Sequence, residues 1–123
     1  MSEDRLLQDY LNDIFESIDD INEFVTGLNF ESFANDKKTV KAVIRSLEVI
    51  GEAVNKLPQN IRNQYSESPW EEMVGMRNRL IHEYFGVDLN IVWQTIEEDL
   101  HSLKRNVRNM YTKLYIDQDQ DQK

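Results

Sequence analysis

Apolar side chains recur at alternating intervals of three and four residues along most of this chain, and this spacing constrains its fold more than any other feature. The first such stretch runs from about Glu3 to Leu28, the second from Val40 to Leu57 and the third from Val92 to Leu114. Residues three and four apart share one face of an α-helix. The spacing therefore predicts three long amphipathic helices.

A further helix, between the second and third of these, is predicted by its start signal. Ser68 stands at the cap position, Pro69 follows in the first turn, and Glu71 lies three residues after the cap. This order of residues is typical of a capping box, in which two side chains satisfy the first free backbone amides. We expect the helix to run toward Tyr84.

Short polar side chains and proline mark the other boundaries. Asn35 or Asp36 can cap the helix that contains Val40, Pro58 ends that helix, and Asp88 can cap the last one. Residues 29–36 break the apolar pattern, so we expect a loop there.

Four such helices with short connections predict an all-α fold, an up-and-down four-helix bundle that spans residues 1–115. The chain has only 4 glycines and 2 prolines, too few for the frequent turns of a β-sandwich or barrel. The closing DQDQDQK has no apolar residue, and we expect residues 116–123 to form a disordered acidic tail.

Composition excludes several classes of function. The chain has no cysteine, so thiolate zinc sites and cysteine nucleophiles are excluded. With 14 basic and 23 acidic side chains its net charge is −9, which argues against a protein that coats nucleic acid but leaves room for a small site of concentrated cations. No apolar run is long enough to cross a membrane and the N-terminus does not resemble a signal peptide, so we expect a cytoplasmic protein with no membrane partner.

The residues best suited to chemistry gather between Met76 and Gly86. Arg77, Asn78, His82 and Tyr84 lie within eight residues of one another. A histidine can accept and donate a proton near neutral pH, and an arginine can hold a phosphate with two parallel donors. Together they suit cleavage of a phosphodiester whose nucleophile is the ribose 2′-hydroxyl, which requires no metal ion. The alternative is an ordinary surface helix with solvated arginines and a packed histidine.

Helical geometry limits how these side chains can cooperate. At about 100° per residue, Arg77 and His82 are separated by about 140° around a straight helix. They can share one phosphate if the helix ends near His82 or if the Arg77 side chain bends across the surface. A two-fold homodimer would also help, because it would form one cleft from two small basic patches.

A second polar group follows the helix that contains Gly51. Arg45, Glu48 and Glu52 are spaced by three and four residues, so they form one line that either pairs internally or orients Arg77 or His82. Gly51 costs about 1 kcal/mol relative to alanine in a helix, and we expect it to permit the close approach of a neighbouring helix. Metal binding is not expected, because the Glu-x-x-His element that ends at His101 has no second copy.

The eight residues from Arg77 to Tyr84 have the pattern R-x4-H-x-Y. Around them stand RSLEVIGEA (45–53), Pro69-Trp70, YFGVD (84–88), Trp93 and Asp99-Leu100. With these residues, in this order along residues 4–114, the chain resembles the HepT-like branch of the HEPN superfamily, whose signature is R-x4-H-x-Y.

The resemblance implies a homodimeric helical bundle that acts as a metal-independent endoribonuclease, the toxin of a type VII toxin–antitoxin pair. Its antitoxin would be a minimal nucleotidyltransferase that transfers AMP from ATP to the motif tyrosine. By position, Arg77 and His82 would be catalytic, Asn78 would help hold the site, and Tyr84 would be modified. From the polar line described above, we expect Arg45 and Glu48 to be further supporting residues. The alternatives are a non-catalytic subunit that binds a nucleotide or supports the nucleotidyltransferase, and a purely structural helical dimer.

Overall fold

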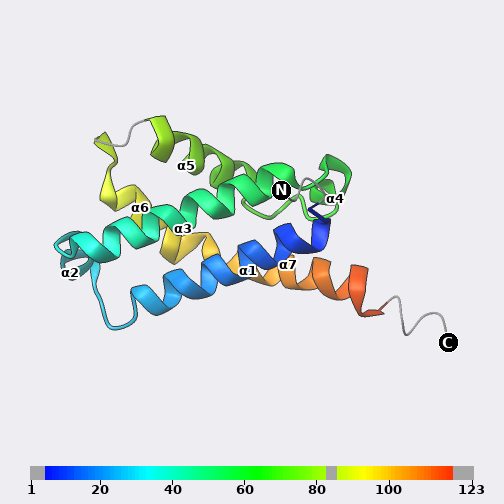
Figure 1. Ribbon diagram of the computed structural model, residues 1–123, viewed down its shortest axis with the longest axis horizontal. Coiled ribbons are helices and arrows are strands. Elements are labelled where there is room, and N and C mark those ends of the chain that lie inside the picture. Colours follow the sequence, from blue (N-terminus) through cyan, green and yellow to red (C-terminus); the bar gives the residue numbers. More distant parts are fainter. Residues whose placement is uncertain (1–4, 83–85, 118–123) are drawn as a thin grey trace.

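The computed structural model describes residues 5–82 and 86–117, and every regular element in these two ranges is a helix. Four arms run alternately up and down (Figure 1). The first three arms are α1, α3 and α5, and the fourth consists of α6 followed by α7. The helices of the described ranges are α1 (Leu7–Phe24), α2 (Phe30–Ala34), α3 (Lys37–Lys56), α4 (Gln59–Asn63), α5 (Trp70–His82), α6 (Leu89–Glu98) and α7 (Leu100–Tyr115). The predicted all-α bundle is thus confirmed.

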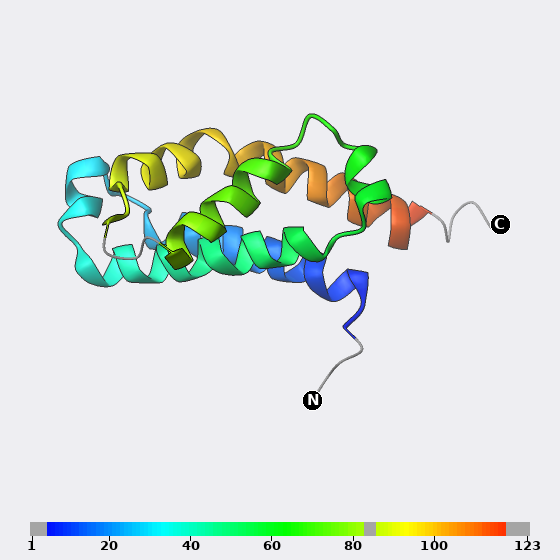
Figure 2. The same cartoon turned by 90° about the horizontal axis from the view of Figure 1, so that it is seen from above.

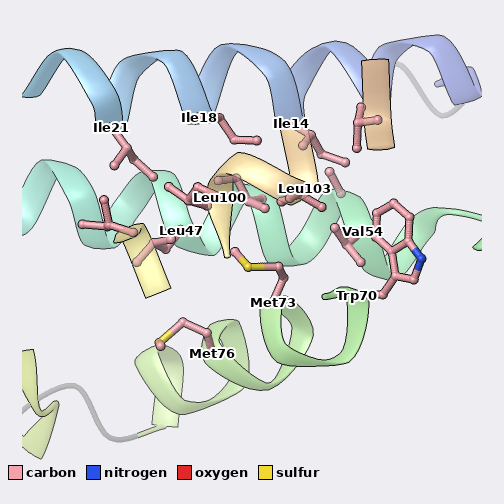
Figure 3. Packing of buried hydrophobic residues seen from close by; sticks show 14 of the residues in the cluster. Ile14, Ile18, Ile21, Leu47, Val54, Trp70, Met73, Met76, Leu100 and Leu103 are labelled. Atoms are coloured by element: carbon pink, nitrogen blue, oxygen red, sulfur yellow. The ribbon is translucent and has the colours of Figure 1, made fainter. Parts of the chain in front are cut away.

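The apolar stripes of the four arms meet in one core. Figure 3 shows Ile14, Ile18 and Ile21 of α1 above the side chains of α3, with residues of α5 approaching from the opposite side. The core side chains that this view labels on the other arms, all buried, are Leu47, Val54, Trp70, Met73, Met76, Leu100 and Leu103. Because each arm loses one whole face to this core, the bundle is held mainly by the hydrophobic effect.

Two predicted helix caps are confirmed. The Asp36 carboxylate accepts hydrogen bonds from the Thr39 amide (3.2 Å) and hydroxyl (2.8 Å) at the start of α3. These bonds lower the pKa of Asp36, since they favour its charged form. At the start of α6, the Asp88 carboxylate accepts from the Asn90 amide at 2.9 Å.

The predicted capping box at Ser68 is wrong. The Ser68 hydroxyl is buried and has no hydrogen-bond partner among the described residues. The carbonyl of Pro69 accepts the first helical bond instead, from the Met73 amide at 3.1 Å. The start of α5 is fixed by the Trp70 indole, whose N–H group lies 2.9 Å from the Tyr65 carbonyl and 3.2 Å from the Arg62 carbonyl.

The loop predicted at residues 29–36 contains α2, a single helical turn. Asn29 caps it by accepting a hydrogen bond from the Ser32 amide at 2.8 Å, and Phe33 is completely buried against the core. The last predicted helix is likewise two helices, because the backbone turns at Asp99. Burial first, and then repulsion from Glu72 and Glu98, raise the pKa of Asp99.

The ends of the chain bear on two further predictions. Helix α7 ends at Tyr115, and most of the predicted tail lies outside the described residues. Tyr84, the residue predicted to be modified, also lies outside them. Within the described ranges, none of the helices has the length and apolar character that crossing a membrane requires.

Candidate active site

The candidate site is organised by a close crossing of α3 and α5. These two helices lie side by side in both views of the fold (Figures 1 and 2). A Cβ atom added to Gly51 of α3 would lie 2.2 Å from the Cβ atom of Arg77 and 2.8 Å from the carbonyl oxygen of Met73. Both distances are far inside van der Waals contact. The prediction that Gly51 permits a close helix approach is therefore confirmed, and the residue that it admits is Arg77.

Two neighbours orient the Arg77 guanidinium. Its Nη2 atom donates to Glu52 Oε1 at 3.3 Å, across the crossing, and its Nη1 atom donates to Asn78 Oδ1 at 2.9 Å on the same helix. The Nε atom is buried without a partner among the described residues. With 29% of its side chain exposed, Arg77 is held in one orientation and keeps donors for an anion.

A groove of about 490 Å³ opens beside Arg77, between α1, α3 and α5. Four cationic side chains line it together with two carboxylates and several uncharged residues: Arg5, Arg45, Lys56 and Arg77 against Asp13 and Glu52. Arg5 is held in place by an ion pair with Asp13 at 2.7 Å and by the face of the Tyr10 ring. In a chain with a net charge of −9, this concentration of cations favours a polyanionic ligand at this groove.

The residues of the polar line on α3 form two separate ion pairs. Arg45 and Glu48 pair with each other at 3.3 Å, and the Arg45 side chain is 69% exposed. Glu52, one turn further on, is the member of this line that bonds to Arg77. Both predicted uses of the line therefore occur, but Glu52 orients Arg77 while Arg45 and Glu48, the two expected supporting residues, pair with each other. Spacing along one helix does not show which position meets the next helix.

His82 is the last residue of α5, and its side chain is exposed. The helix continues up to it, so Arg77 and His82 point about 140° apart around α5. Asn78, one turn before His82, shares its side of the helix and also bonds to Arg77. The two predicted catalytic residues therefore do not lie side by side on α5.

The described parts of the chain hold no group of three histidine, aspartate or glutamate side chains that could bind a metal ion.

Similarity to known proteins identifies the family of this chain. Residues 14–110 match the family described as Ribonuclease HepT-like. The chain belongs to this family. The expected HepT-like resemblance is therefore confirmed over most of the bundle.

Several named proteins from other organisms are similar to the chain over most of its length. The chain is 52% identical over 100 residues to "Probable ribonuclease HepT" of Thermococcus cleftensis, covering 81% of this chain and 91% of that protein. It is 43% identical over 104 residues to "Putative RNase TTE0752" of Caldanaerobacter subterraneus, covering 85% and 93%. It is 46% identical over 101 residues to "Putative RNase MJ1216" of Methanocaldococcus jannaschii, covering 82% and 84%. No solved structure matches the chain at a significant level.

Proposed function

We propose that this protein is a metal-independent endoribonuclease that acts in the cytoplasm. The observation that carries the proposal is the arginine of the R-x4-H-x-Y motif, which Glu52 and Asn78 hold at the edge of a groove lined by further cations. Membership of the Ribonuclease HepT-like family and the ribonuclease names of its relatives support the same activity.

In the proposed reaction the ribose 2′-oxygen attacks the adjacent phosphorus while the bond from phosphorus to the 5′-oxygen breaks. His82 accepts the proton of the 2′-hydroxyl or supplies one to the leaving 5′-oxygen. Arg77 stabilises the negative charge that develops on the phosphoryl oxygens. The products are a 2′,3′-cyclic phosphate and a free 5′-hydroxyl.

Incubation of purified protein with total RNA in excess EDTA tests this reaction. Cleavage should persist, because both proposed catalytic groups are side chains, and the new ends should carry a 2′,3′-cyclic phosphate or its opened product. Loss of cleavage in EDTA with recovery in magnesium would contradict the mechanism. RNA that stays intact under all conditions would favour the non-catalytic alternative.

We also propose that the protein works as a two-fold homodimer. Arg77 and His82 diverge around α5, so a second copy placed against this face can bring the His82 of one protomer toward the Arg77 of the other. The composite cleft would then hold one phosphate between groups from both chains. Light scattering at micromolar concentration should give twice the monomer mass, and a monomer would count against the shared cleft.

The toxin–antitoxin role is proposed from the resemblance and from the position of Tyr84, two residues after His82. A minimal nucleotidyltransferase antitoxin would transfer AMP from ATP to the tyrosine oxygen and release pyrophosphate. The added phosphodiester carries about one negative charge, which would compete with RNA for Arg77, and its nucleoside would block the cleft.

Intact mass measured after incubation with a nucleotidyltransferase encoded beside this protein's gene, ATP and magnesium tests the modification. We expect increments of about 329 Da, the mass that one AMP group adds to a hydroxyl. These should be absent in Tyr84→Phe, with Tyr65→Phe as a matched control that keeps them. Neutralisation of the toxin without any change in mass would show that the antitoxin acts by binding alone.

A further inference from the structure

Helix α7 has a charge opposite to that of the rest of the molecule. Its 16 residues, LHSLKRNVRNMYTKLY, include four lysines or arginines and one histidine but no acidic residue. Its neighbour α1, LQDYLNDIFESIDDINEF, has six acidic residues and no basic one. In a chain with 23 acidic and 14 basic side chains, so uneven a distribution concentrates positive potential on one surface.

Three of these side chains form a single exposed ridge. His101, Arg105 and Arg108 are spaced by four and three residues, so they lie within about 60° around the helix. All three are exposed. Neither arginine forms an ion pair with a side chain in residues 5–82 or 86–117. We call His101, Arg105 and Arg108 the α7 ridge.

Lys104 lies beside the α7 ridge and, unlike the two arginines, forms an ion pair. Its Nζ atom pairs with Asp19 of α1 at 2.6 Å, which ties α7 to its acidic neighbour. Arg105 and Arg108 take no part in this ion pair, so the cations of the α7 ridge remain available to a ligand.

The α7 ridge forms one wall of a groove of about 380 Å³. The opposite side and the floor of this groove are formed by Ile18 and Asn22 of α1 and by Ile96 and Leu100, at the junction of α6 with α7. Three of these four are buried apolar residues. A hollow with an apolar floor and a cationic wall suits a ligand that is both anionic and partly apolar.

This groove is separate from the one beside Arg77. The two share no lining residue. Figure 1 shows α7 beside α1, on the opposite side of α3 from α5. A ligand on the α7 ridge therefore does not occupy the candidate active site.

We propose that the α7 ridge and its groove bind a stretch of single-stranded RNA away from the bond that is cut. Arg105 and Arg108 contact successive phosphates, and a base rests on the apolar floor beside the His101 imidazole. Proteins that bind single strands commonly combine a cationic track with a surface on which bases stack. The proposal rests on the proposed function, because it takes RNA as the substrate.

The test compares Arg105→Gln/Arg108→Gln with Lys38→Gln/Lys41→Gln, which removes the same charge from exposed positions of α3. Both pairs are placed in the full chain carrying His82→Ala, and binding of a single-stranded RNA of about 20 nucleotides is measured against salt. Loss of two phosphate contacts should weaken binding about tenfold or more and reduce the slope of log K against log salt by about 1.4. The control pair should change the slope far less.

A second measurement uses the active chain. Arg105→Gln/Arg108→Gln should raise KM for the long RNA far more than KM for a trinucleotide, since a longer strand has more residues with which to contact the second groove. Equal binding and equal KM in the two double variants, with RNA still cleaved, would overturn the α7 ridge proposal alone. Binding that depends on Arg105 and Arg108 without any cleavage would support it and contradict the nuclease. Equally tight binding of poly-glutamate would identify a protein-docking surface and overturn it.

Discussion

Replacing His82 by alanine should slow RNA cleavage by about 10²–10⁴-fold, the usual loss when a general acid or base is removed. The protein should stay folded, because His82 is exposed at the end of α5 and contributes no core contact. Single-turnover rates on a defined RNA measure the loss, and the same variant should no longer arrest growth when expressed in cells. The thermal midpoint of the variant should match that of the unaltered protein.

Chemical rescue separates proton transfer from a structural role. If His82 moves a proton, free imidazole should restore part of the rate of His82→Ala, and the restored rate should follow the imidazole concentration. Imidazole should not restore activity to Arg77→Ala, since that residue stabilises charge rather than moving a proton. A His82→Ala enzyme with its full rate would remove this histidine from the mechanism.

Replacing Gly51 by alanine should have the largest effect on stability. In an isolated helix this change would stabilise by about 1 kcal/mol. Here the new methyl group would meet the Cβ atom of Arg77 at 2.2 Å and the Met73 carbonyl at 2.8 Å, so α3 and α5 must separate. Overpacking of this kind costs about 1–3 kcal/mol and sometimes more. We expect a net loss of about 2 kcal/mol, together with a fall in cleavage rate because Arg77 itself is displaced.

Gly75→Ala is the matched control. Gly75 lies on α5, and a methyl group added there would meet no atom within 4 Å beyond the backbone of its own helical turns. It should stabilise the protein by about 1 kcal/mol through helix propensity alone and leave cleavage unchanged. Urea denaturation of both variants gives the two free energies of unfolding. A Gly51→Ala protein as stable as Gly75→Ala would contradict the close crossing.

The fold could be predicted from the sequence because the apolar spacing of each arm records the face that it buries. Features shorter than one apolar repeat could not be predicted in this way. Helix α2 has a single turn, so no repeat can show it. The apolar repeat continues through the turn at Asp99, so the pattern could not distinguish one bent arm from two helices. Ser68 matched a local signal, but the packing of Trp70 against two backbone carbonyls fixed the start of α5 instead.

Part of the candidate site could likewise be predicted from the sequence, and part of it could not. Gly51 is conspicuous in a helix, and its use could be predicted because few other reasons justify its cost. Whether Glu48 or Glu52 meets Arg77 depends on where α5 crosses α3, and that crossing is set by contacts between residues far apart in the sequence. Neither the cationic groove beside Arg77 nor the groove under the α7 ridge could be predicted, because each joins side chains from separate helices.

The acidic surface of α1 separates these two cationic surfaces. One end of the helix contributes Tyr10 and Asp13 to the groove beside Arg77, and residues further along, Ile18 and Asn22, contribute to the groove under the α7 ridge. Its carboxylates repel a polyanion that lies along the helix. At physiological ionic strength the Debye length is about 8 Å, so this repulsion acts only on nucleotides already close to α1. On the proposed function, it would therefore orient an RNA strand after capture and favour a flexible strand that bends around the helix over a stiff duplex.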